Sequence, residues 1–363
     1  MKLLADQDIP LVEHYFGSSF DIILKAGRTI QPADLIDIDM LIVRAVTRVD
    51  QTLLGHSSVS FVGSVTSGAD HLDRTWLTRA GIEWRIAKGC NAMAVVEYVI
   101  CVIAVLNTMG FLAQEKPRAA VIGVGEIGSK VVSTLTQLGF DVLQCDPLRA
   151  QQEPDFPHTP FEKIEQVDLI SFHVPLTRDH DYSTYHLVNK RFLQQQQSNC
   201  VLINTSRGDI IPFSELKRYG QHLLWCLDVF EDEPDIDLAI LQQALIATPH
   251  IAGYSVQSKH RGIHMIYEAA VQAQKMLPLL QDVLPMKRKI VSLDSSITTW
   301  QKVVLQLFNP LEMTERMRQQ LLAQPKSFDL LRKRFTDRYE FQFVDIFPNP
   351  VPIDRLNTLG FNG

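Results

Sequence analysis

Short apolar segments recur along the first part of the chain, and each is followed by polar or turn residues. They are Lys2–Ala5, Asp21–Leu24, Met40–Val43 and Ser60–Gly63. Continuous apolar runs that alternate with helical stretches are typical of strands in a parallel sheet covered by helices. The pattern therefore predicts an α/β domain at the start of the chain.

A second set of apolar segments follows a helix that we expect to begin near Asn91. They are Ala119–Gly123, Asp141–Cys145, Leu169–Phe172, Val201–Asn204 and Leu223–Leu227. The apolar stretch from Ala92 to Leu106 contains Glu97 and is shorter than the roughly 20 residues that cross a bilayer, so we expect a buried helix there. Past Gly253 the chain becomes helical as far as Gln274, and we expect this helix to return to the first domain.

The composition changes near the end of the chain. The change is marked by Pro278, Pro285 and the basic run 287–289. The sequence after them predicts helices and a strand at Glu340–Asp345. We interpret this region as a third, small domain, and the length of 363 residues agrees with two or three domains.

Charge and cysteine content narrow the class of protein. A formal net charge of −6 argues against a general nucleic-acid surface. The start of the chain has too short an apolar run for a secretory signal. The cysteines are odd in number and lack CxxC spacing, so we expect reduced core residues of a cytoplasmic protein: Cys90, Cys101, Cys145, Cys200 and Cys226.

A glycine-rich segment follows the first strand of the second set. Gly123 permits a tight turn, Gly125 lets the backbone approach a pyrophosphate, and Gly128 permits close packing of helix on strand. The helix that begins after Ile127 points its unsatisfied N–H groups at the phosphates. Such a motif alone is weak, but its place between a strand and a helix favours a dinucleotide site.

Asp146 ends the next strand at the distance expected for an acid that binds the adenosine ribose. An acid at this position repels a 2′-phosphate, so it favours NAD over NADP. The alternative is a simple Asp-Pro turn, because Pro147 follows. Arg149 argues in the other direction, since a nearby arginine can accept the phosphate of NADP.

Two later residues carry groups that hydride transfer at a hydroxy acid requires. Arg207 ends a strand, and its planar guanidinium can hold a carboxylate in bidentate fashion. His250 titrates near working pH, so its imidazole can take a proton from an alcohol or give one to a ketone. Each residue alone has an ordinary structural explanation, as a surface arginine or a core histidine.

An upstream carboxylate changes the interpretation of His250. A carboxylate bonded to the far nitrogen of an imidazole fixes its tautomer and favours the imidazolium. We choose Glu233 for this role, while Glu231 and Asp232 remain competitors because the sequence does not distinguish among the three.

The segments around Gly123–Gly128, Arg207, Asp228–Pro234 and His250 resemble those of the D-isomer-specific 2-hydroxyacid dehydrogenases. The resemblance is closer to a subgroup that acts on a phosphorylated 2-hydroxy acid. It extends over Val43–Thr47, Phe61–His71, Gly89–Tyr98, His250–Tyr254, Ser327–Lys333 and Leu359–Asn362.

The resemblance implies a fold and an activity. The fold is two Rossmann-like doubly wound parallel-sheet domains with a cleft between them, plus a small α+β C-terminal domain. The substrate domain spans 1–94 and 255–286, and the NAD-binding domain spans 95–254. Residues 287–363 form the C-terminal domain, through which two chains associate as a homodimer. The activity is the oxidation of the C2 hydroxyl of a phosphorylated hydroxy acid, with NAD as cofactor and no metal.

The resemblance also implies roles for individual residues. Arg207, Glu233 and His250 correspond to the catalytic set. Residues near NAD are Gly123, Gly125, Ile127, Gly128, Asp146, Val174, Asp228 and Gly253. Residues near substrate are Thr66 and Tyr254, and Ala45 can contribute only through its backbone. The family subgroup usually has a serine where this chain has Ala45, so that hydroxyl contact is missing here.

The distal phosphate needs a cation beyond Arg207. We expect Arg44 first and Arg338 second, the latter from a basic group that also contains Arg332, Lys333 and Arg334. Two other functions stay open: a dehydrogenase for another hydroxy acid such as phosphoglycerate, and an NAD(H)-sensing corepressor on the same fold. The complete Arg207, Glu233 and His250 set argues against the corepressor.

Overall fold

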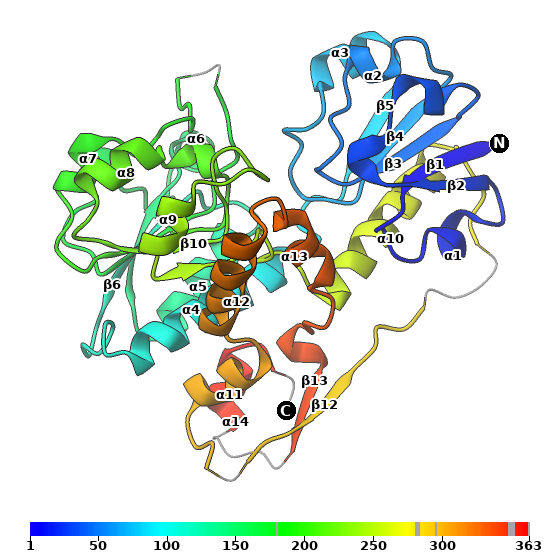
Figure 1. Cartoon of the computed structure of the whole chain (residues 1–363). Coiled ribbons are helices and arrows are strands. Elements are labelled where there is room, and N and C mark those ends of the chain that lie inside the picture. Colours follow the sequence, from blue (N-terminus) through cyan, green and yellow to red (C-terminus); the bar gives the residue numbers. More distant parts are fainter. Residues whose placement is uncertain (179–180, 280–283, 295, 348–352, 362–363) are drawn as a thin grey trace. The chain divides into compact units, whose positions relative to one another are not determined.

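The computed structural model describes residues 1–178, 181–279, 284–294, 296–347 and 353–361, so Asn362 of the C-terminal motif lies outside the described residues. Contacts divide the chain into two compact units (Figure 1). Unit 1 contains Met1–Asn91 and Ser255–Lys287, and unit 2 contains Ala92–Tyr254 and Arg288–Gly363.

Unit 1 is built on a parallel sheet of five strands in the order β2-β1-β3-β4-β5. The strands are β1 (Lys2–Asp6), β2 (Asp21–Lys25), β3 (Met40–Val43), β4 (Phe61–Ser64) and β5 (Glu83–Ile86). The predicted strands are all present. The sequence analysis missed β5 because this edge strand alternates polar with apolar residues and is only partly buried.

Successive residues of a strand point to opposite faces of the sheet, and both faces of unit 1 are covered. Leu3 and Ala5 pack on the side of α1 (Val12–Phe16) and α10 (Val256–Gln272). Leu4 packs on the other side, with residues of α2 (Gln51–Leu54) and α3 (Arg74–Arg79). Helix α10 therefore returns to the first sheet, as predicted.

Unit 2 is built on a parallel sheet of six strands in the order β11-β10-β9-β8-β6-β7. The strands are β6 (Arg118–Ile122), β7 (Asp141–Cys145), β8 (Leu169–Phe172), β9 (Val201–Asn204), β10 (Leu224–Leu227) and β11 (Ile246–Ala247). The two doubly wound parallel sheets confirm the predicted fold class.

Helices connect these strands and cover the sheet of unit 2. They are α4 (Ala92–Thr108), α5 (Gly128–Gln137), α6 (Pro147–Gln152), α7 (Lys190–Gln194), α8 (Phe213–Tyr219) and α9 (Leu238–Gln243). Helix α4 is buried along most of its length, and Glu97 within it accepts a hydrogen bond from the backbone N–H of Phe341 at 2.7 Å. Among the described residues, we find no helix of sufficient length and apolar character to cross a membrane.

The C-terminal segment packs into the hydrophobic core of unit 2. Its elements are β12 (Lys289–Ser292), α11 (Trp300–Leu307), α12 (Pro310–Ala323), α13 (Phe328–Arg334), β13 (Val344–Phe347) and α14 (Ile353–Thr358). The strand expected at Glu340–Asp345 begins later, because Phe341–Phe343 form a 3-10 turn. The division into three domains stays a prediction.

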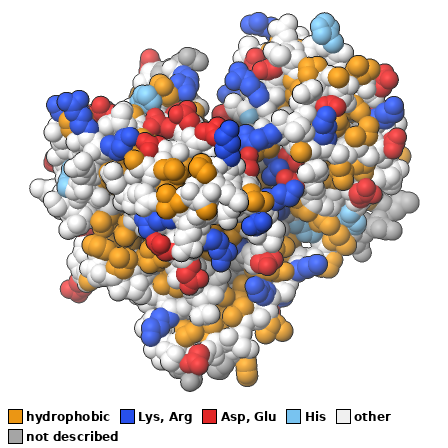
Figure 2. All heavy atoms as spheres, in the orientation of Figure 1, with side chains coloured by type: hydrophobic (Ala, Val, Ile, Leu, Met, Phe, Trp, Pro, Cys, Tyr) orange, Lys and Arg blue, Asp and Glu red, His pale blue; other side chains and the backbone are white. Residues whose placement is uncertain are grey.

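The surface and the cysteines agree with the composition. Charged side chains of both signs are interspersed with apolar ones on the visible face of each unit (Figure 2). All five cysteines are buried free thiols. Burial raises the pKa of Cys101 and of Cys200 to about 12, so these thiols stay protonated and inert at neutral pH.

Candidate active site

Each sheet changes its strand order beside its first strand, between β1 and β3 in unit 1 and between β6 and β8 in unit 2. Open parallel sheets bind ligands outside the carboxyl ends of the strands at such a switch point. The glycine loop follows β6, and Val174 follows β8. Arg44 follows β3, so predicted site residues lie at both switch points.

The three glycines of the loop meet three different steric demands. Gly123 has φ of +86°, and a Cβ there would lie 2.7 Å from Cγ1 of Val174. A Cβ on Gly128 would lie 1.9 Å from the carbonyl oxygen of Gly123, whereas a Cβ on Gly125 would have no atom within 4 Å. Gly123 and Gly128 are thus required by the fold, while Gly125 leaves open space beside the backbone.

Helix α5 begins at Gly128, and its N-cap residue Ile127 makes no side-chain capping hydrogen bond. An N-terminus of this kind carries partial positive charge and suits a pyrophosphate. The open space at Gly125 and this helix end together fit a dinucleotide cofactor.

Asp146 has the turn role that the sequence analysis gave as the alternative, and its ribose role stays a prediction. It is the N-cap of α6, accepting from the N–H of Arg149 at 3.0 Å, and its other oxygen accepts from the N–H of Val124 in the glycine loop at 2.9 Å. Arg149 donates to the carbonyl of Val124 at 3.0 Å and pairs with Glu153 at 2.9 Å. Asp146 is therefore fixed against the cofactor loop, and the charge of Arg149 is partly compensated.

The sequence analysis missed His173, which directly follows β8. Its Nε2 lies 2.8 Å from the hydroxyl of Ser171, and its backbone N–H donates to the carbonyl of Ile122 at 2.7 Å. Burial lowers the pKa of His173 to about 3, so the imidazole is neutral. The sequence feature that could have drawn attention to it is a histidine directly after an apolar strand, at the edge of the sheet where ligands bind.

Arg207 follows β9 in a turn that Asn204 organises. The side chain of Asn204 donates to the carbonyl of Arg207 at 2.9 Å and accepts from the N–H of Ser206 at 3.0 Å. A Cβ on Gly208 would lie 2.0 Å from the carbonyl carbon of Phe230. The arginine turn and the loop after β10 therefore approach so closely that only glycine fits between them.

His250 and Glu233 form a hydrogen-bonded pair. Nδ1 of His250 lies 2.7 Å from Oε2 of Glu233, and Oε1 of Glu233 accepts from the N–H of Phe230 at 3.0 Å. Burial raises the pKa of Glu233, but the charge and hydrogen bond of His250, the charge of Arg332 and the N–H of Phe230 together outweigh it, so the pKa is lowered overall. Glu233 is thus an acceptor, which leaves Nε2 of His250 to exchange a proton.

The two competing acids lie elsewhere. Glu231 accepts from the N–H of Phe213 at 2.7 Å and lies 3.9 Å from Nε2 of His186. Asp232 is exposed and has φ of +58°. Of the three acids, Glu233 is the one that contacts His250.

Asp228 organises the loop that carries His250. Its carboxylate is 1% exposed and accepts from the hydroxyl of Thr248 at 2.6 Å and from the N–H groups of Ile251 and Ala252 at 2.8 Å each. Burial raises the pKa of Asp228 to about 6, against these donors and the charge of His250. Tyr98 extends this series of hydrogen bonds, because its hydroxyl lies 2.6 Å from the hydroxyl of Thr248.

The structure does not support a substrate role for Arg338. The residue is 5% exposed, and its guanidinium donates to the carbonyls of Ala252, at 3.0 Å, and of Ala94. Arg338 thus joins the His250 loop to α4. A sequence gives the charge of an arginine but not its direction, and the substrate role of Arg338 stays a prediction that these contacts do not favour.

Arg332 of α13 contacts the predicted substrate residue Tyr254. Its Nη2 donates to the Tyr254 hydroxyl at 3.1 Å, and its guanidinium carbon lies 5.6 Å from the centre of that ring. Gly253 precedes Tyr254 in the same loop. The N–H of Tyr254 donates to the carbonyl of Ile251 at 2.8 Å, which closes the turn.

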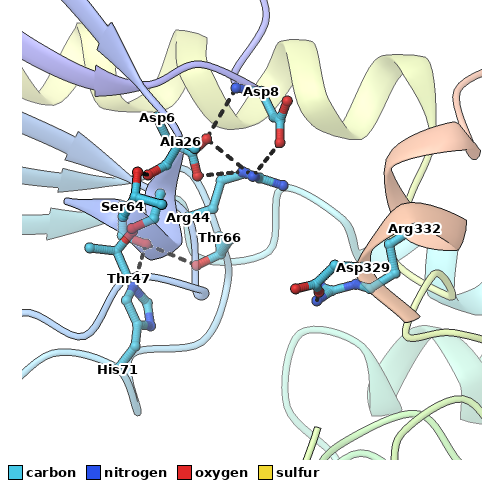
Figure 3. Close-up of polar contacts among 12 residues, drawn as sticks. Asp6, Asp8, Ala26, Arg44, Thr47, Ser64, Thr66, His71, Asp329 and Arg332 are labelled. Atoms are coloured by element: carbon cyan, nitrogen blue, oxygen red, sulfur yellow. Dashed lines mark hydrogen bonds and ion pairs between the residues drawn. The ribbon is translucent and has the colours of Figure 1, made fainter. Parts of the chain in front are cut away.

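The remaining predicted substrate residues lie in unit 1 (Figure 3). Arg44 donates to both oxygens of buried Asp6, at 2.8 and 3.1 Å, and to Asp8 at 2.8 Å. Thr66 lies 2.8 Å from the hydroxyl of Ser64, and Ala45 is exposed. Among the described residues we find no group of three His, Cys, Asp or Glu that could hold a metal ion.

Comparisons with known proteins agree with this geometry. Residues 107–252 match the family model of the D-isomer specific 2-hydroxyacid dehydrogenase, NAD binding domain. The erythronate-4-phosphate dehydrogenase of Coxiella burnetii is 39% identical over 99% of this chain and all of that protein. The enzyme of the same name from Tolumonas auensis is 34% identical over all of this chain and 99% of that protein.

A solved structure shares the fold. The NAD-dependent formate dehydrogenase of Staphylococcus aureus, in complex with NAD, has a TM-score of 0.64 at 19% identity, covering 78% of this chain and 98% of that one. The full-length relatives and the matched NAD-binding domain lead to one conclusion: this chain belongs to the erythronate-4-phosphate dehydrogenases, within the D-isomer-specific 2-hydroxyacid dehydrogenase family.

Proposed function

We propose that the protein oxidises 4-phospho-D-erythronate to (R)-3-hydroxy-2-oxo-4-phosphobutanoate with NAD, as a step in the synthesis of pyridoxal 5′-phosphate. The observation that carries the proposal is the 2.7 Å pair of His250 and Glu233 in the unit that holds the dinucleotide loop. The names of the full-length relatives supply the substrate.

The side chains divide the reaction between them. Arg207 binds the carboxylate of the substrate through two parallel hydrogen bonds. Nε2 of His250 takes the proton of the C2 hydroxyl, while Glu233 accepts from Nδ1 and stabilises the imidazolium that forms. Bound NAD supplies the acceptor for the hydride that leaves C2. The products are then a 2-oxo acid, reduced cofactor and a proton held on His250.

Cofactor binding is assigned to the loop and its neighbours. Gly125 and the start of α5 would hold the pyrophosphate, and Asp146 would bind the adenosine ribose. Val174, Asp228 and Gly253 complete the proposed set. Asp228 is proposed to contact the cofactor through its own backbone, because its carboxylate is already held by three donors of the His250 loop.

Arg44 is the proposed reader of the distal phosphate. Asp6 holds it in bidentate fashion through Nε and Nη2, and Asp8 also accepts from Nη2, so these two carboxylates fix the direction of the guanidinium. Lys259 of α10 adds a second cation: burial, together with the charge of Arg44, lowers its pKa, and Asp8 opposes this shift. Thr66 and Ala45, the latter through its backbone, are proposed to contact the substrate nearby.

We also propose a cytoplasmic homodimer that binds neither nucleic acid nor membrane. Two large apolar side chains on the strands of the C-terminal segment support the dimer: Ile290 on β12 is 77% exposed and Phe347 on β13 is 72% exposed. Apolar side chains that stand out on a small sheet are typical of a contact surface.

The test is a substrate panel. Purified protein with NAD is assayed against erythronate 4-phosphate, unphosphorylated erythronate and 3-phosphoglycerate, in wild type and in Arg44→Ala. We expect the highest kcat/KM with erythronate 4-phosphate and loss of the phosphate preference in the variant, mainly through KM. A preference for phosphoglycerate would replace the proposed substrate, and turnover of none of these acids would favour the NAD(H)-sensing alternative.

A further inference from the structure

The C-terminal segment supports the loop that carries Glu233. Helix α13 is anchored by Phe328, which is fully buried, and by Leu331, which is 4% exposed. The ring of Phe328 meets the ring of Phe230 edge to face, with centroids 6.2 Å apart. The N–H of Phe230 in turn donates to Glu233. The loop that binds Glu233 is therefore packed against a segment that the sequence analysis assigned to assembly.

The same helix directs a cation toward this site. The Arg332 side chain is 11% exposed and lies 3.5 Å from Asp329 one turn earlier. Figure 3 shows these two side chains beside each other. Its guanidinium donates to the Tyr254 hydroxyl and also lies over the Tyr254 ring. A planar guanidinium can make both contacts at once, which an ammonium group cannot.

We propose that Arg332 is a positioning residue for the reaction: it fixes the Tyr254 ring and places a cation beside the loops that carry Glu233 and His250. The inference rests on the proposed function, because it assigns Arg332 to the same catalytic pair. It gives the C-terminal segment a role in the chemistry of its own chain, in addition to any role in assembly.

Electrostatics support the second part of this role. The charge of Arg332 is one of the causes that lower the pKa of Glu233 against the effect of burial. Asp228 also interacts with His250, and Asp329 lies beside Arg332. Removing the Arg332 cation therefore favours the protonated form of Glu233.

The experiment uses two variants that separate the two contacts. Arg332→Gln keeps a donor for the Tyr254 hydroxyl but loses the charge, whereas Arg332→Lys keeps the charge but loses the planar contact with the ring. Arg334→Gln is the matched control, because Arg334 is exposed on the same helix. The kcat and KM of each variant are measured across pH, together with resistance to urea.

We expect Arg332→Gln to move the acid limb of the kcat/KM profile up by about half a pH unit, because a nearby cation no longer opposes protonation. Arg332→Lys should keep the limb in place but raise KM, and Tyr254→Phe should remove most of that KM effect. The control should match wild type. A merely structural arginine would instead lower stability and kcat/KM with no change in the profile, which would overturn the proposal.

A second readout does not depend on turnover. The ring signals of His250 are followed by NMR through a pH titration, with and without NAD, in wild type and in Arg332→Gln. A midpoint that rises in the variant supports the inference even if erythronate 4-phosphate proves not to be the substrate. An unchanged midpoint contradicts it, even if the enzyme turns over as proposed. Should Arg332→Gln fail to fold, an Arg332→Lys variant with wild-type KM would overturn the proposal.

Discussion

Replacing Gly208 by alanine should disrupt the site without removing any catalytic group. The new Cβ would lie 2.0 Å from the carbonyl carbon of Phe230, 2.2 Å from its oxygen and 2.3 Å from the N–H nitrogen of Glu231. All three are backbone atoms, so no side chain can rotate away. Ordinary contact begins at 3.4 Å, and the two loops must therefore separate by about 1.4 Å.

The displacement affects both halves of the predicted catalytic set. Arg207 precedes Gly208 directly, and Phe230 donates its N–H to Glu233. A misplacement of about 1 Å can cost about 100-fold in rate, because the reacting groups leave the geometry for attack. Overpacking of this kind typically costs about 1–3 kcal/mol in the free energy of unfolding. We therefore expect kcat/KM to fall about 100-fold in a protein that still folds.

The assay compares Gly208→Ala with Gly220→Ala. At Gly220 a new Cβ would lie 2.8 Å from Cδ1 of Leu216, the end of a flexible side chain, and 3.0 Å from the backbone oxygen of Leu216, a much milder contact than the 2.0 Å at Gly208. Both variants are characterised by kcat/KM, by NAD affinity and by urea unfolding. We expect the control to stay near wild type and both variants to bind NAD. If Gly208→Ala keeps wild-type kcat/KM, the close approach of these loops does not position the catalytic groups.

Three further outcomes are expected. Asp146→Ala should weaken NAD binding and lessen discrimination against NADP, because a ribose partner and a repulsive charge are lost. Titration of the variant with both cofactors checks this, and a wild-type protein that prefers NADP would contradict it. Glu233→Gln should move the acid limb of the kcat/KM profile to lower pH, since the imidazolium loses its carboxylate, and an unmoved limb would redirect attention to Glu231 or Asp232. Truncation after Lys287 should give aggregates or monomers, because it exposes the core of unit 2, and light scattering that finds the full-length protein monomeric would refute the dimer.

The sequence predicted the sheets well, because buried parallel strands are written as continuous apolar runs. It missed β5, where Glu83 and Arg85 alternate with apolar residues, and the two-residue strand β11. It placed the last strand too early, because the apolar residues of Phe341–Phe343 suit a buried 3-10 turn equally well.

The site was predictable only as far as residue type and order allow. Glu231, Asp232 and Glu233 are consecutive acids, and the choice among them depends on backbone direction, which the sequence does not record. Arg338 illustrates the same limit, since its guanidinium binds buried carbonyls. The pairing of Arg44 with Asp6 joins residues far apart in the chain, and it could be found only once β1 and β3 were known to be neighbours.

The central claim is that His250, oriented by Glu233, exchanges the proton at C2 of the substrate. It is tested most directly by kcat for erythronate 4-phosphate with saturating NAD in wild type and in His250→Ala, alongside NAD affinity from a direct binding titration. Acid–base catalysis is worth about 100- to 10,000-fold, so we predict a fall in kcat of that size with NAD binding nearly intact. A His250→Ala enzyme that keeps the wild-type kcat would contradict the account.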